Sequence, residues 1–484
     1  MGRLPGQSRS EGRYYDVRVT APKALDTLPE SPRIFGPPYR APTVGILLVV
    51  TLIAFEGMSV GVAMPDITAE LNARDLYGVS FSAFLIASLF ANVVAGLWSD
   101  RRGYAMPFLA GLVLFVLGMG LAGAAHSEWL FLVARVVQGL GAGAAIVALY
   151  VMIARVYPQD LRPRVFAALS AAWVVPSMVG PTVAGIVTKE LSWRWVFVGI
   201  IPLVLPALVM LVPALRSGSA AGEPGSAQGP RSRPLAMTVA ASATAAGAGL
   251  LLFAVDRLRA DPVPALLGCA VSLALLGYGL VKLLPPGALR FGRGLPTTVM
   301  MRGLFSAAFF GVNSFIPLAL MTGKSFTAAT AGIALTTGAL GWSAGSYLQS
   351  RRDAEPHRRI RLGAAFVTAG IVLSVAAVLP GVSGWVAVPA WIVAGLGMGL
   401  GMTTVNVTAL KQSPVHEQGA NSASLSVTDM LGSALTVGVA GALVNAIGHG
   451  PQQIAWGFAA ICGLMGVIGL AAVLLSGRVA SSGS

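Results

Sequence analysis

Three ionisable side chains stand inside apolar runs of the chain, where a charge is costly. Glu56 and Asp429 lie near the middle of their runs, and Arg135 lies inside a third run, close to its start. Placing an arginine at the centre of a membrane helix costs about 2.5–3.5 kcal/mol of insertion free energy. A charged residue inside a membrane helix therefore indicates a function. These three residues are therefore the first candidates for chemistry.

The two acids could exchange a proton for a positively charged compound. A carboxyl group in an apolar environment favours its neutral form, whereas an approaching cation or arginine favours the charged form. A proton and a cation would then compete for one site, which is the physical basis of proton-coupled exchange. For Glu56 the alternative is a structural hydrogen bond to a neighbouring helix. Asp429 lies about 16 Å into its run. The helix that carries it need not line a cavity.

Arg135 lies in a segment whose other residues favour close helix packing. Gln138 follows it by three positions, so both side chains share one helix face. Gly139 and Gly143 form a pair of small residues four apart, which permits a tight crossing with another helix. Arg135 could alternatively extend to the outer membrane surface, because the start of the run is near.

The composition requires a membrane environment for these residues. Of the 484 residues 55% are hydrophobic and 11% are charged, with a mean hydropathy of +0.75, whereas soluble domains carry about 25% charged residues. The two cysteines, Cys269 and Cys462, lie in apolar runs, and we expect them to serve packing and to form no disulfide. No spacing typical of a metal site is present, and we expect neither a metal nor a cofactor.

The apolar runs predict fourteen membrane-spanning helices, each of about 20 residues. They are 43–65, 76–98, 104–124, 129–154, 165–187, 193–214, 236–255, 263–284, 297–321, 327–349, 361–380, 384–408, 420–446 and 453–476. Lysine and arginine concentrate in every second connector, as the positive-inside rule requires for alternating crossings. We therefore expect both termini in the cytoplasm of a cell whose inner membrane holds the protein. The net charge of +14 follows from this topology, so a nucleic-acid partner is not expected.

Two short motifs carry a resemblance to a known family. The first is the turn Gly96-Leu-Trp-Ser-Asp100-Arg101-Arg102-Gly103 between the second and third spans. The second is Gly180-Pro181-Thr-Val-Ala184-Gly185 in the fifth span, which resembles the antiporter motif Gly-Pro-x-x-Gly-Gly with alanine replacing one glycine. With fourteen spans, the chain resembles the drug:proton antiporter branch of the major facilitator superfamily.

The resemblance implies a fold of two six-helix bundles with an inserted two-helix hairpin. The corresponding divisions are a cytosolic tail at 1–42, a first bundle at 43–215, a linker with the hairpin at 216–296, a second bundle at 297–476 and a tail at 477–484. We expect the hairpin to pack peripherally and the protein to be a monomer.

The resemblance also assigns roles to the motifs. Gly96, Asp100, Arg101 and Gly103 would form a latch that stabilises one conformation, although the turn could simply be a solvated basic loop. Arg135 would take part in proton coupling together with Glu56 and Asp429. Gly180, Pro181 and Gly185 would support the rocking of an exporter, and a proline-kinked packing helix is the alternative.

A second group of residues could line a substrate cavity. Cavity helices of the second bundle would offer Phe309, Asn313, Met402 and Asn406, and the first bundle would add Gln138. Aromatic rings and methionine suit a tolerant apolar pocket with a few polar anchors. The same residues could equally serve packing or face lipid.

We therefore expect a transporter and not an enzyme. The leading hypothesis is a proton-coupled antiporter that exports amphiphilic, cationic drug-like compounds by alternating access. A dedicated exporter of one endogenous metabolite, lipid or antibiotic would share every motif. A membrane-embedded enzyme or lipid scaffold is a remote alternative, because no nucleophile–base pair is evident in the sequence.

Overall fold

The computed structural model describes every residue except 1, 3–33, 221–233, 352–354, 415–416 and 481–484. The described chain is helical and contains no strand. Most of the predicted tail at 1–42 lies outside the described residues, as does the end of the predicted tail at 477–484.

The helices follow the predicted order closely. The first half contains α1 (Arg40–Glu70), η1 (Arg74–Leu76), α2 (Tyr77–Arg102), α3 (Ala105–Gly123), α4 (Glu128–Val156), α5 (Arg162–Glu190), α6 (Arg194–Val198) and α7 (Ile201–Ala220). The inserted segment contains α8 (Pro234–Arg257), α9 (Pro262–Leu283) and η2 (Ala288–Arg290). The second half contains α10 (Leu295–Asn313), α11 (Ile316–Lys324), α12 (Ala328–Arg351), α13 (Pro356–Ser374), η3 (Val375–Val378), η4 (Gly384–Val386), α14 (Ala387–Gln412), α15 (Gln418–Ile447), α16 (Pro451–Leu475) and η6 (Ser476–Val479).

Thirteen helical segments of the described chain are long and apolar enough to cross a membrane. Two of these segments are broken helices, α6 with α7 and α10 with α11. The remaining predicted span is α12, which has 24 residues but mixes threonine, serine and glycine with its apolar side chains. It packs between α5 and α14, so little of its surface needs to match lipid. The predicted all-α membrane fold is confirmed.

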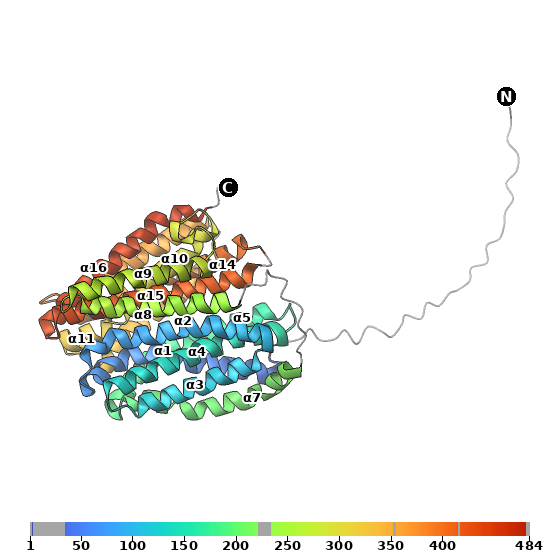
Figure 1. Ribbon diagram of the computed structural model, residues 1–484, viewed down its shortest axis with the longest axis horizontal. Helices are drawn as coiled ribbons and strands as arrows, with labels where there is room; N and C mark the ends of the chain where they lie inside the picture. Colours follow the sequence, from blue (N-terminus) through green and yellow to red (C-terminus); the bar gives the residue numbers. More distant parts are fainter. Residues whose placement is uncertain (1, 3–33, 221–233, 352–354, 415–416, 481–484) are drawn as a thin grey trace.

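The helices form two bundles, one from each half of the chain. Figure 1 shows α1 to α7, coloured blue to green, beside α10 to α16, coloured yellow to red. In the first bundle α4 packs on α2 and α3, and α1 packs on α5 and α7. In the second bundle α14 packs on α12 and α13, and α10 packs on α15 and α16. The predicted pair of six-helix bundles is present.

The two bundles meet along two helix pairs, α5 with α12 and α2 with α15. Here the end of the bundles at which α1 begins and α16 finishes is called proximal, and the opposite end distal. At the distal end the Tyr77 hydroxyl donates to the Ser314 carbonyl at 2.7 Å, and Ser82 donates to the Ala434 carbonyl at 2.7 Å. These bonds close the distal end of the seam between the bundles.

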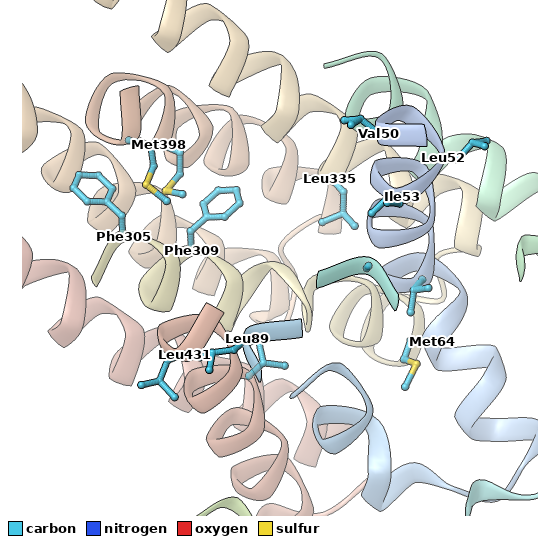
Figure 2. Close-up of a cluster of buried hydrophobic side chains, with 14 of the residues drawn as sticks. Val50, Leu52, Ile53, Met64, Leu89, Phe305, Phe309, Leu335, Met398 and Leu431 are labelled. Atoms are coloured by element: carbon cyan, nitrogen blue, oxygen red, sulfur yellow. The ribbon is translucent and has the colours of Figure 1, made fainter. Parts of the chain in front are cut away.

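Apolar side chains continue the same seam toward its middle. Figure 2 shows Leu89 of α2 beside Leu431 of α15, and Leu335 of α12 near Ile53 of α1. All four are buried. The seam is therefore a packed surface over this depth, and the two bundles share one continuous core.

Glycines on α4 set how closely the first bundle packs. A Cβ atom on Gly139 would lie 2.3 Å from the Phe84 carbonyl oxygen, and one on Gly143 would lie 2.3 Å from the Ser88 carbonyl oxygen. Only a residue without a side chain fits at such a crossing. The predicted pair of small residues therefore brings α4 against α2, and this contact fixes the height of Arg135 in the bundle.

The inserted hairpin lies over the seam between α2 and α15. Its first helix, α8, contacts both of these helices, and α9 packs on α8. Most of α9 faces outward, as expected for a peripheral element, with Leu266, Leu267 and Val281 exposed. The hairpin is peripheral, yet through α8 it contacts both bundles.

Candidate functional site

A buried ion pair lies at the centre of the first bundle. Arg135 Nη1 of α4 donates to Glu56 Oε1 of α1 at 2.5 Å, and the two side chains are 3% and 0% exposed. The same nitrogen donates to Gln138 Oε1 at 2.8 Å. Two of the three intramembrane charges predicted from the sequence are thus partners.

The Arg135 guanidinium is enclosed by side chains of the first bundle. The Arg135 guanidinium lies over the Phe84 ring, with its central carbon 4.5 Å from the ring centroid. Arg135 therefore does not extend to the membrane surface, because its guanidinium is held inside the bundle. Gln138, predicted to line a substrate cavity, is instead fully buried as an acceptor for Arg135.

Some polar atoms of this cluster lack a hydrogen-bond partner among the described residues. They are Glu56 Oε2, Arg135 Nε and Gln138 Nε2. Burying a charge pair costs desolvation energy, and the pair is stabilising only when its remaining polar atoms are also satisfied. The Glu56–Arg135 contact is therefore an expensive arrangement for a helical bundle. Such an arrangement indicates a role beyond stability.

A second ion pair lies in the other bundle and is more open. Arg302 Nη2 of α10 contacts Asp429 Oδ2 of α15 at 2.6 Å, with the side chains 23% and 24% exposed. Arg302 Nη1 also donates to Asn406 Oδ1 of α14 at 2.5 Å, and Ser306 donates to Asp429 Oδ1. Four side chains from three helices converge here.

The open pair also interacts with the first bundle. Tyr150 of α4 lies within electrostatic range of both Arg302 and Asp429. Tyr150 and the buried Arg135 are on the same helix, fifteen positions apart. The second ion pair therefore faces the first bundle across the seam.

Arg302 is a site residue that the sequence analysis missed. It stands in the apolar run 297–321, so the signal that singled out Arg135 was present for it too. Its position near the start of the run made it resemble the arginines of the preceding connector. The structure separates the two cases, because the guanidinium turns inward to Asp429 and Asn406.

The other predicted cavity residues of the second bundle serve its packing. Phe309 stacks on Trp391 with ring centroids 4.8 Å apart, and Asn313 Oδ1 accepts from Trp391 Nε1 at 3.0 Å. Met402 and Phe309 are each 4% exposed. Figure 2 shows Phe309 with Phe305 and Met398 inside this bundle. Of the predicted cavity set, only Asn406 reaches the open charge cluster.

The predicted latch turn lies at the proximal end. α2 ends in Arg101 and Arg102, and Gly103 follows with φ +83°, a left-handed conformation that suits glycine. Asp100 interacts electrostatically with Arg155 of α4, and Gly96 lies 3.6 Å, at its Cβ position, from Val147. These neighbours belong to the same bundle. In the described residues no hydrogen bond or ion pair joins Asp100 or Arg101 to the second bundle.

The fifth-span motif lies on the seam between the bundles. A Cβ atom on Gly185 would lie 2.5 Å from Ala329 Cα of α12. The Gly332 position of α12 approaches the Pro181 carbonyl oxygen to 2.7 Å in the same way. The Gly180 carbonyl accepts from Ser59 of α1 at 3.4 Å. The motif therefore lies at the contact between the two bundles.

The family model described as "Major Facilitator Superfamily" matches residues 46–437. The chain belongs to the major facilitator superfamily. This match runs from α1 into α15, so it includes the first bundle, the hairpin and most of the second bundle. It agrees with the resemblance seen in the turn after the second span.

Relatives of this superfamily chain include named multidrug transporters. "Multidrug efflux pump SdrM" of Staphylococcus aureus is 26% identical over 169 residues, which cover 35% of this chain and 38% of the relative. "Multidrug resistance protein 3" of Bacillus subtilis is 28% identical over 168 residues, 35% of this chain and 33% of the relative. The matched part thus spans about a third of the length of these relatives.

Solved structures confirm the superfamily fold at low identity. A peptide transporter POT in complex with sulfate has a TM-score of 0.66 at 16% identity, covering 93% of this chain and 96% of its own. A bacterial homologue of the lysosomal transporter Spinster, inward-facing and unoccupied, has a TM-score of 0.64 at 15% identity, covering 91% and 97%. These likenesses concern the fold alone and extend over about nine-tenths of the chain.

Proposed function

We propose that this chain is a proton-coupled antiporter that exports amphiphilic, cationic compounds. The observation that carries the proposal is the buried ion pair between Glu56 and Arg135. Glu56 is the only acid of the described chain with a wholly buried side chain. The named multidrug relatives support a drug-like cargo.

The buried pair can work as a coupling device because it has two charge states. With Glu56 ionised, the pair carries no net charge and the Glu56–Arg135 contact is kept. When Glu56 takes up a proton, Arg135 loses its counter-ion inside a low-dielectric bundle and must find another partner. Proton binding therefore changes the preferred packing of α1 against α4, and both helices belong to the bundle that rocks.

The open pair between Arg302 and Asp429 is the proposed binding site for the cationic compound. A cationic compound entering between the bundles would compete with Arg302 for Asp429, which is partly exposed. Displacing Arg302 would loosen its bond to Asn406 as well. The cargo thus changes contacts among α10, α14 and α15, while the proton changes contacts among α1 and α4.

Closure at the distal end supports alternating access around these sites. Tyr77 and Ser82 bond across the seam there, while the latch turn at the proximal end has no such bond in the described residues. With the proximal end in the cytoplasm, as the basic connectors predict, this is an inward-facing state. The protein would sit as a monomer in the inner membrane.

The proposal is tested by Glu56→Gln in reconstituted vesicles. The substitution keeps the shape and removes the titratable group, so we expect normal expression but no gradient-driven efflux of a cationic dye. Glu355→Gln is the matched control, because Glu355 pairs with Arg358 at 3.0 Å but is 59% exposed. The control should export like the parent. If Glu56→Gln also does so, Glu56 is structural.

A dedicated exporter of one endogenous compound remains the second candidate, since it would use the same machinery. A susceptibility panel of unrelated compounds separates the two. Altered tolerance to several compounds supports a multidrug exporter. Altered tolerance to one compound supports a dedicated exporter.

A further inference from the structure

A pocket opens at the distal end of the seam, and neither ion pair lines it. Its volume is about 640 Å³, within the range of drug-binding pockets. Its walls come from both bundles, with α1, α5 and residues 191–193 on one side and α11, residues 326–327 and the start of α12 on the other. The pocket therefore exists only while the bundles meet as they do here.

The floor of the pocket is the closed seam itself. Ala328 lines the pocket, and the backbone of Ala328 and Ala329 is the surface on which Gly185 of the antiporter motif packs. A compound that passes between α5 and α12 when they separate would arrive in this pocket. Its position is that of an exit vestibule.

The pocket combines a free carboxylate with apolar walls. Asp66 and Glu70 are four positions apart on α1 and both line it. Glu70 is already engaged, since it accepts from Arg194 at 2.6 Å and from Trp193 Nε1 at 2.7 Å. Asp66 has no hydrogen bond or ion pair among the described residues. Met321 and Phe326 provide the apolar wall opposite.

The positive charge at the rim does not cancel this carboxylate. Lys189 also lines the pocket, but its ammonium lies 3.2 Å from Glu190, and both side chains are more than half exposed to solvent. Arg194 is committed to Glu70 and to the Ala125 carbonyl. The pocket is left with one uncompensated negative charge, carried by Asp66, beside apolar side chains.

We propose that this vestibule binds lipophilic cations, with Asp66 as the charge partner and Met321 and Phe326 as the apolar contact. The proposal rests on the proposed export of cationic compounds and adds a second binding site for the same compounds, at the distal end. A half-buried carboxylate beside an aromatic ring is complementary to a cation whose charge is shielded by apolar groups.

The test uses a pair of probes with the same shape and opposite charge. Thr327 lines the pocket and is exposed, so Thr327→Cys gives a label site in the full-length protein once Cys269 and Cys462 are replaced by serine. Tetraphenylphosphonium should slow labelling of this cysteine by a maleimide in lipid nanodiscs. Tetraphenylborate should not. Equal protection by both probes would overturn the proposal.

Asp66→Asn should raise the tetraphenylphosphonium concentration that halves the labelling rate, the half-protecting concentration, on the order of fivefold. That change matches the contribution of one partly exposed ion pair. Asp261→Asn, at a carboxylate that is 60% exposed and lies outside the lining, should leave that concentration unchanged. If Asp66→Asn proves unstable, Ala69→Arg places a positive charge in the pocket at an exposed position and should abolish protection. Unchanged protection in the available variant would contradict the role of Asp66.

The labelling assay does not require transport, so the two proposals can fail separately. Glu56→Gln should keep full protection while losing efflux. A parent protein that exports cations but shows no protection would reject the vestibule and leave the export function standing. Protection without any export would reject the export function and leave the vestibule.

Discussion

At the residue scale, the molecule separates its two ion pairs by exposure. Glu56 and Arg135 are sealed within one bundle, whereas Arg302 and Asp429 keep about a quarter of their side-chain surface open. A sealed pair responds mainly to small species such as protons, and an open pair can also meet a larger compound. Under the proposed function, this division would give the two pairs different tasks in one transport cycle.

The sealed pair predicts a specific pattern of stabilities. Arg135→Leu leaves Glu56 without its counter-ion and should destabilise the fold by about 3–5 kcal/mol if Glu56 stays charged. The double variant Glu56→Leu/Arg135→Leu removes both charges and should recover much of that loss. Thermal unfolding of the purified variants at neutral pH measures both. A double variant that is no more stable than the single one would contradict the pairing.

Sequence reasoning found these residues because a charge in an apolar run is rare. It named Glu56, Arg135 and Asp429, and the structure makes Arg135 the partner of Glu56. Sequence reasoning could not name partners, since Glu56 and Arg135 are 79 positions apart and meet only through the packing of α1 near α4. Gln138 was predicted to line a cavity. Its spacing shows that it shares a helix face with Arg135, but spacing does not show what that face contacts.

At the element scale, glycines set the helix spacing that brings the charges together. Gly139→Ala should destabilise the protein, because its Cβ would meet the Phe84 carbonyl oxygen, a backbone atom that cannot turn aside. Gly120→Ala is the matched control, since nothing lies within 4 Å of its Cβ position on α3. The control should be neutral or stabilising by up to about 1 kcal/mol. Folded yield and thermal midpoint compare the two, and equal behaviour would contradict this packing.

Several contacts join the hairpin to α15 of the second bundle, although α8 also packs against α2 of the first bundle. Ser424 of α15 donates to the Leu283 carbonyl at the end of α9 at 2.7 Å, and Arg259 donates to the Ala446 carbonyl of α15. Toward the end of α8, a Cβ on Gly438 of α15 would lie 2.4 Å from the Leu252 side chain. The later part of α8, the loop between α8 and α9, and the end of α9 thus all contact α15.

These contacts predict that the hairpin moves together with the second bundle. A disulfide between Leu252→Cys and Gly438→Cys should therefore leave cation efflux within about twofold of the reduced protein. Efflux in vesicles before and after a reducing agent measures this, with each single cysteine as the control. Loss of efflux on oxidation that returns on reduction would show that α8 and α15 must separate.

At the scale of the whole molecule, the order of spans was readable from the sequence, because lipid-length apolar runs and basic connectors repeat. The conformation was not readable. Closure of the distal end depends on contacts such as Tyr77 to Ser314, which are 237 positions apart and carry no pattern. The position of the hairpin over the seam could not be predicted from the sequence either, since its composition predicts only a peripheral element.

The central claim is that a proton on Glu56 is exchanged for a cation. It is tested most directly by recording internal pH in vesicles that hold the purified protein while a cationic dye is added. The account predicts proton movement opposite to the dye in the parent and none with Glu56→Gln. Dye uptake by the parent protein that moves no protons, or that continues with the same proton movement in Glu56→Gln, would contradict it.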